Sequence, residues 1–74
     1  MKPTRVTNSI RTLRFAHGEM TQADLAERIG VTRQTVIAIE QGKYSPSLEV
    51  AFQIAQVFGV TLDAVFHYPE VGSK

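Results

Sequence analysis

The side chains best suited to recognition chemistry cluster in the second half of the stretch from Thr21 to Gly42. They are Arg33, Gln34, Thr35 and Ala38. Arginine, glutamine and threonine can hydrogen-bond to base edges or phosphates, and an alanine methyl can contact the methyl group of thymine. Because these residue types open one predicted helix together, they indicate the reading of a nucleic-acid groove rather than catalysis.

Start and stop signals place these side chains in a helix-turn-helix. Thr21 is a good N-cap and Asp24 completes a capping box, so a helix is predicted to start after Thr21 and to end at Gly30. Thr32 is a second N-cap, and Gly42 is a second stop. Two helices joined by a tight turn are the arrangement that offers a second helix to a major groove.

Residues at helical spacing mark the inward faces of these two helices. The inward positions are Leu25, Ala26 and Ile29 on the first helix and Val36, Ile39 and Glu40 on the second. Ile37 fits neither the inward face nor the middle of the polar face. Exposure, a contact with the sugar-phosphate edge and a contact with a partner subunit all stay open for Ile37.

A further helix is predicted near the N-terminus, where apolar residues recur at helical spacing. These residues are Val6, Ile10 and Leu13. The helix should run from about Arg5 to Ala16, with Thr4 as its candidate N-cap. Arg14 lies beside the apolar stripe, which suggests a partly buried cation that needs an anion, and Glu40 is the candidate.

Two more helices are predicted in the second half of the chain. Ser47 should cap a helix that ends at Gly59. Its expected inward stripe is Leu48, Ala51, Phe52, Ala55 and Phe58. Thr61 should cap a short fifth helix that carries Leu62, Val65 and Phe66 and ends by Pro69. No run alternates with period two for long enough to predict a strand, so the expected fold class is all-α, a compact bundle of five short helices.

Length and composition exclude several classes of function. The 74 residues make one domain, with a loose end at 1–4, a helical domain at 5–68 and a tail at 69–74. The chain has no cysteine, its two histidines, His17 and His67, are far apart, and each is predicted to lie near a helix end. It also lacks a glycine-rich phosphate loop. We therefore expect no enzyme, no metal, no cofactor and no small-molecule substrate.

The charge distribution predicts an acidic partner, and the hydropathy predicts a cytoplasmic protein. Of eight lysine and arginine residues, seven come before Tyr44, together with four of the seven acidic residues. A basic half fits nucleic acid, although a chance distribution of solvated charge explains it equally simply. There is no apolar run long enough to span a bilayer and no leader at the N-terminus, so we expect a cytoplasmic protein with no membrane partner.

The stretch TQADLAERIGVTRQTVIAIEQGKYSPSLEVAFQIAQVFGVTLDAVF resembles the phage-repressor and Cro type of helix-turn-helix, the Xre family of regulators. The resemblance depends on TQ and LA in the first helix, G at the turn, T at the second cap, IE and G at the end of the second helix, then SPSLE and GV. It runs from about Asn8 to His67. It implies the five-helix, lambda-repressor-like fold.

The resemblance also implies roles for single residues. Gln22 would clamp a phosphate and brace a base-reading side chain, and Thr32 would offer its amide or hydroxyl to the DNA backbone. Base edges would be faced by Arg33, Gln34 and Ala38, and phosphates by Lys43, Tyr44 and Ser45. Arg14 and Glu40 match an ion pair that links the first helix to the third.

The function expected from this resemblance is a sequence-specific transcriptional regulator, a repressor, that binds palindromic double-stranded DNA as a homodimer. The predicted dimer interface is Phe66, Tyr68 and Val71; of these Tyr68 is the better candidate, because Phe66 is better explained as a plug at the base of the bundle. The alternative is a protein-interaction module, such as an antitoxin component with secondary DNA binding. A third reading is a nucleic-acid binder without sequence preference.

Overall fold

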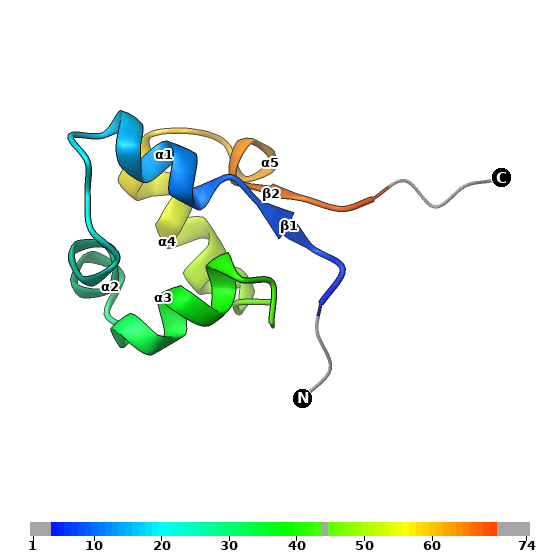
Figure 1. The fold of residues 1–74 in the computed structure, drawn as a ribbon. Coiled ribbons are helices and arrows are strands. Elements are labelled where there is room, and N and C mark those ends of the chain that lie inside the picture. Colours follow the sequence, from blue (N-terminus) through cyan, green and yellow to red (C-terminus); the bar gives the residue numbers. More distant parts are fainter. Residues whose placement is uncertain (1–3, 44, 70–74) are drawn as a thin grey trace, which may run out of the picture.

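Five helices and one two-stranded β-ladder make up the part of the chain that the computed structural model describes, residues 4–43 and 45–69 (Figure 1). In chain order the elements are β1 (Thr7–Asn8), α1 (Ile10–Ala16), α2 (Gln22–Ile29), α3 (Arg33–Glu40), α4 (Leu48–Phe58), α5 (Leu62–Val65) and β2 (Phe66–His67). The predicted helical fold class with five short helices is confirmed. The β-ladder is a small addition that the sequence did not predict.

Local capping signals set the bounds of α2, α3 and α4 where they were predicted. Thr21 Oγ1 accepts a hydrogen bond from the Asp24 backbone N–H at 3.0 Å, and Asp24 Oδ2 accepts one from the Thr21 N–H at 3.3 Å. The hydroxyls of Thr32 and Ser47 each accept a backbone N–H in the first turn of the helix that follows. Gly30 ends α2 with a φ of 74°, a left-handed conformation that glycine adopts without steric cost.

The first helix is shorter than predicted because an extended segment precedes it. α1 begins at Ile10 rather than near Arg5, and β1 pairs antiparallel with β2. Asn8 Oδ1 accepts from the Ile10 N–H at 3.1 Å, so Asn8 satisfies a free donor at the start of α1. The predicted cap was wrong, since Thr4 Oγ1 accepts from the N–H of Val6 instead.

The fifth helix also ends earlier than predicted. α5 stops at Val65, and Phe66 and His67 are extended as β2 rather than helical. His67 lies two residues beyond the end of α5, in β2 rather than in the helix, and its Nε2 is 3.1 Å from Ser9 Oγ. Each strand has only two residues, too few for alternation to show in the sequence.

The core is made of apolar side chains from all five helices, with Ile10, Leu25 and Val65 fully buried. α2 packs against α3 and α4, and α4 packs against α5. The predicted inward stripe of α4 was wrong for Leu48 and Phe52, which are 66% and 50% exposed. The inward face is instead centred on Ile54 and its buried neighbours. No helix in the described ranges is both long and apolar enough to cross a membrane.

The arrangement in space separates two ends of the molecule. In the view of Figure 1, α1 lies above α3, with α2 at one end of the molecule and the β1–β2 ladder at the other. Both described ends of the chain leave the bundle along this ladder. The N-terminal segment meets the loop after α3, where Ser45 Oγ donates to Thr4 Oγ1, and Arg33 and Gln34 at the start of α3 are exposed.

Candidate nucleic-acid interface

The outer face of α3 carries the polar side chains singled out in the sequence. Arg33 and Gln34 are exposed at its N-terminal end, and Thr35 is half-buried. On the opposite face Val36 is 1% exposed and Ile39 is 2% exposed, so α3 is anchored through its apolar stripe. The structure thus leaves the first turn of α3 accessible.

The turn between α2 and α3 is held by backbone hydrogen bonds. The Val31 N–H donates to the Ala26 carbonyl at 3.0 Å, and the Gly30 N–H donates to the Glu27 carbonyl at 3.4 Å. Thr32 then caps α3, and its hydroxyl is 3.0 Å from that of Thr35. These bonds fix the direction in which α3 leaves the turn, which a groove-reading helix requires.

An ion pair joins α1 to the end of α3, where the resemblance implied one. Arg14 Nε donates to Glu40 Oε2 at 2.7 Å, and Arg14 Nη2 donates to Glu40 Oε1 at 3.2 Å. Arg14 Nη1 donates to the Met20 carbonyl at 2.7 Å. The two charged side chains are only 8% and 9% exposed, so this is a buried, bidentate pair.

Gln22 belongs to the same network. Its Nε2 donates to Glu40 Oε1 at 3.3 Å, which places the first residue of α2 beside the end of α3. Among the described residues the side-chain partner of Gln22 is this carboxylate rather than a base-reading side chain. The amide oxygen of Gln22 stays available to a further donor, and its predicted role toward phosphate remains a prediction.

An open groove of about 820 Å³ lies between α1, the N-terminal end of α2 and α3, and both ends of α3 line it. Arg11 and Arg14 contribute to it from α1, Gln22 from α2 and Arg33 from α3. Glu40 also lines the groove, but its charge is balanced by Arg14. The groove therefore runs from the N-terminal end of α3 onto the surface of α1.

The loop after α3 continues the exposed polar surface. Gly42 has a φ of 71°, and the N–H of Lys43 donates to the Ala38 carbonyl at 3.0 Å, which closes the helix. The side chains of Lys43 and Ser45 are exposed, and Ser45 Oγ donates to Thr4 Oγ1 at 2.7 Å. Tyr44, the third predicted phosphate contact in this loop, lies outside the described residues.

Asn8 is a positioning residue that sequence reasoning missed. Its Nδ2 donates to the Ile39 carbonyl at 2.9 Å, while its Oδ1 accepts from the N–H of Ile10, the first residue of α1. Asn8 thus ties the start of α1 to the end of α3. The N-cap of α1 is Ser9, so the available signal was only the residue type, since asparagine side chains often hydrogen-bond to nearby backbone N–H groups.

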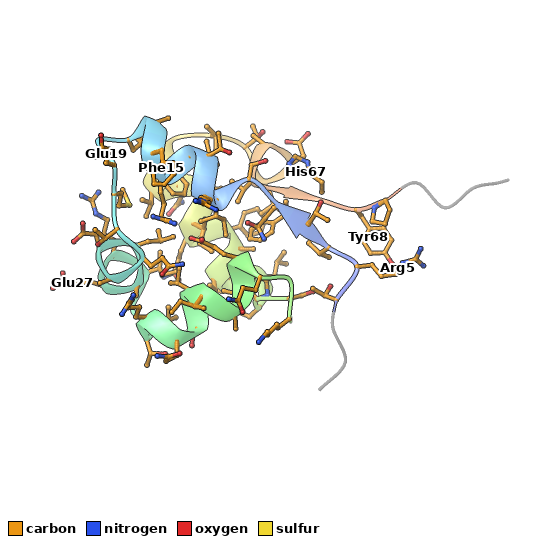
Figure 2. All side chains as sticks on the ribbon, viewed as in Figure 1. Arg5, Phe15, Glu19, Glu27, His67 and Tyr68 are labelled. Atoms are coloured by element: carbon orange, nitrogen blue, oxygen red, sulfur yellow. The ribbon has the colours of Figure 1, made fainter. Side chains whose placement is uncertain are left out.

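The predicted dimer surface is brought together only in part. Phe66 is half-buried and packs on the core, while Tyr68 is 60% exposed. Figure 2 shows Tyr68 near Arg5, at the end of the molecule opposite α2. Val71 lies outside the described residues.

Residues 10–65 match the helix-turn-helix family model, and this match identifies the family of the chain. The chain belongs to the Xre-type helix-turn-helix family. An HTH-type transcriptional regulator of Methanocaldococcus jannaschii is 51% identical over 63 residues, 85% of this chain and 94% of the relative. The cryptic phage CTXphi transcriptional repressor RstR of Vibrio cholerae is 36% identical over 56 residues, 76% of this chain and 50% of RstR.

A solved structure supports the fold independently of these sequences. The crystal structure of a protein from Bacteroides fragilis superposes with a TM-score of 0.72 over 84% of this chain and 98% of that protein, at 24% identity. As a member of the Xre-type family the chain is a DNA-binding transcriptional regulator. The matched range begins with α1 and ends with α5, so it covers the five helices of the described chain.

Proposed function

We propose that this Xre-type protein is a sequence-specific repressor that binds palindromic double-stranded DNA as a homodimer in the cytoplasm, with α3 in the major groove. The observation that carries the proposal is the exposure of Arg33 and Gln34 on the first turn of a helix whose other face is buried. A rigid helix with exposed polar residues at its N-terminal end is what a major groove accepts.

The proposed DNA contacts divide into side chains that would read base edges and side chains that would bind the DNA backbone. Arg33 can pair bidentately with the O6 and N7 atoms of guanine, which supplies about 1 to 3 kcal/mol of discrimination. Gln34 can pair with adenine in the same way, and the methyl of Ala38 can contact thymine. Gln22 and Lys43 flank these positions and would hold phosphates, which fix the register of α3 without reading sequence.

Repression and dimerisation are supported by different observations. RstR, a relative of this chain over half of its own length, is a transcriptional repressor. One α3 of eight residues is about 12 Å long and can read only one groove segment. Two copies on half-sites about 34 Å apart would read a palindrome, and the exposed ring of Tyr68 offers apolar surface for such a pair.

A protein-interaction module is the second candidate, and the exposed face of α4 favours it. Leu48 and Phe52 lie one helical turn apart and are both at least half exposed. Ile37, for which a contact with a partner subunit was left open, is half-buried and so offers less apolar surface to a partner. Retention on heparin that falls steeply with salt would favour the DNA-binding function, because phosphate contacts release counterions.

The test is selection of binding sites from random double-stranded DNA, followed by binding of Arg33→Ala to single-base variants of the selected site. We expect a palindrome, and we expect Arg33→Ala to lose discrimination at one guanine position in each half-site by about 1 to 3 kcal/mol. Arg28→Ala is the matched control, since Arg28 is exposed in the last turn of α2.

Two outcomes would contradict the proposal. Enrichment of no sequence would remove sequence-specific binding altogether. Equal weakening of Arg33→Ala on every variant would make Arg33 a phosphate contact and leave the base reading unexplained.

For a dimer that neutralises about six phosphates, log K should also fall with log salt at a slope of about −5.

A further inference from the structure

We infer that Arg11 on α1 binds a DNA phosphate and that Phe15 positions its guanidinium for this contact. The inference rests on the proposed function and extends it to a helix outside the helix-turn-helix. It starts from two features that the base-reading account leaves unused: an exposed arginine on α1 and, one turn later, a phenylalanine that is 54% exposed.

Arg11 faces the same groove as the proposed DNA contacts. Gln22 and Arg33 line this groove from α2 and α3, and Arg11 lines it from α1. If α3 lies in a major groove, the wall formed by α1 stands beside the sugar-phosphate backbone that borders that groove. A cation on this wall therefore meets phosphate rather than base edges.

The other arginine on this wall cannot take that role. All three Arg14 nitrogens donate within the protein, to Glu40 and to the Met20 carbonyl, and its side chain is only 8% exposed. Within the described ranges Arg11 forms no ion pair and is exposed. Arg11 is thus the α1 cation whose donors can turn to an incoming anion.

Phe15 explains how a long side chain is kept over the groove. The Arg11 guanidinium carbon lies 5.6 Å from the centroid of the Phe15 ring, and that of Arg14 lies 5.5 Å away. A guanidinium stacked on a ring uses its face and leaves the N–H groups at its edge free. Those edge donors match the bidentate geometry of a phosphate.

The charge balance of the groove also favours an anion. Once Arg14 and Glu40 are paired, Arg11 and Arg33 remain against the exposed Glu19. The groove therefore keeps a positive excess on the side that would face DNA. Figure 2 shows Glu19 on the connection after α1, beyond Phe15, so this acid lies at the far end of the wall.

The test is the salt dependence of binding to the selected DNA site by Arg11→Ala. Each phosphate contact contributes about 0.9 to the slope of log K against log salt. Loss of one contact per subunit should lower the slope of a dimer by about 1.8 and weaken binding about 30-fold at 0.15 M salt. The loss should be the same on all single-base variants, because a phosphate contact reads no sequence.

Phe15→Leu tests the positioning role, since leucine keeps an apolar side chain but removes the ring. We expect Phe15→Leu to weaken binding about two- to five-fold per site in the parent protein and to have no further effect in Arg11→Ala. A purely structural role for Phe15 would instead give the same loss in both backgrounds. Arg28→Ala should leave the slope unchanged.

The outcomes separate the inference from the proposed function. An unchanged slope in Arg11→Ala, while Arg33→Ala still loses base discrimination, would overturn the inference and leave the function standing. Failure of the parent protein to bind any DNA would overturn both.

Discussion

At the scale of single residues, Glu40 is the centre of the interface although it contacts no DNA in this account. Its two carboxylate oxygens accept from Arg14, and one of them also accepts from Gln22. The carboxylate thus connects α1, α2 and α3 at one point. The helical pattern predicted that Glu40 faces inward, and the resemblance suggested Arg14, but the link to Gln22 depends on packing that one sequence does not display.

Removing one member of this pair should destabilise the domain strongly. Arg14→Ala leaves the Glu40 carboxylate buried without its counter-charge, which costs about 3 to 5 kcal/mol in the free energy of unfolding. The double variant Arg14→Met with Glu40→Leu should recover most of that loss, since both charges are gone. Urea denaturation measures the changes, with Arg28→Ala expected to stay within about 0.5 kcal/mol of the parent.

A loss below about 1 kcal/mol in Arg14→Ala would contradict this assignment, because it would mean that water replaces the arginine at little cost. A double variant as unstable as the single one would contradict it as well. That result would show that the shape of the two side chains matters rather than their charge.

At the scale of elements, the sequence predicted the helix bounds, which depend on neighbouring residues. It missed the strand pairing, which joins residues far apart in the chain. The bounds of α2, α3 and α4 follow from caps within a few residues of each end, and these were predicted correctly. The β-ladder pairs Thr7 with His67, and no local pattern announces a contact across nearly the whole chain. Pairing with β2 holds the segment before α1 extended, which shortens the predicted first helix.

Gly30 makes the turn between α2 and α3, so its substitution tests how much the left-handed backbone of this turn contributes to stability. A Cβ at this position would meet nothing within 4 Å, and the cost of Gly30→Ala is therefore the left-handed backbone alone. We expect a loss of about 1 to 2 kcal/mol in the free energy of unfolding, measured by urea denaturation. Gly30→Asn is the matched control and should lose less, because asparagine tolerates this conformation better.

An unchanged stability in Gly30→Ala would show that the turn relaxes out of the left-handed region in solution. A loss much larger than 2 kcal/mol would show that a side chain is excluded there by contacts absent from the structure.

At the scale of the whole molecule, the two ends suit two different tasks. The groove and the first turn of α3 form one face, while Tyr68, which directly follows β2, lies at the opposite end from α2 (Figure 2). The sequence predicted this division only through its charge, with most cations before Tyr44. The apolar face of α4 was not predicted, because Leu48 and Phe52 share the helical spacing of the buried stripe.

The oligomeric state tests the proposed dimer at this scale. Sedimentation of the parent protein should give about twice the 8.2 kDa of one chain. Tyr68→Glu should shift the mass to that of a monomer, because a charge buried in an apolar contact is costly. Leu48→Glu is the comparison variant: dissociation of this variant alone would place the interface on α4 and remove Tyr68 from it.

The proposal that the first turn of α3 reads base edges in a major groove can be tested at a single atom, guanine N7. The measurement compares the affinities of the parent protein and Arg33→Ala for the selected site with guanine or 7-deazaguanine at the position assigned to Arg33. We predict that removing N7 weakens the parent by about 1 to 3 kcal/mol and leaves Arg33→Ala unaffected. An equal effect of the substitution on both proteins would contradict the claim.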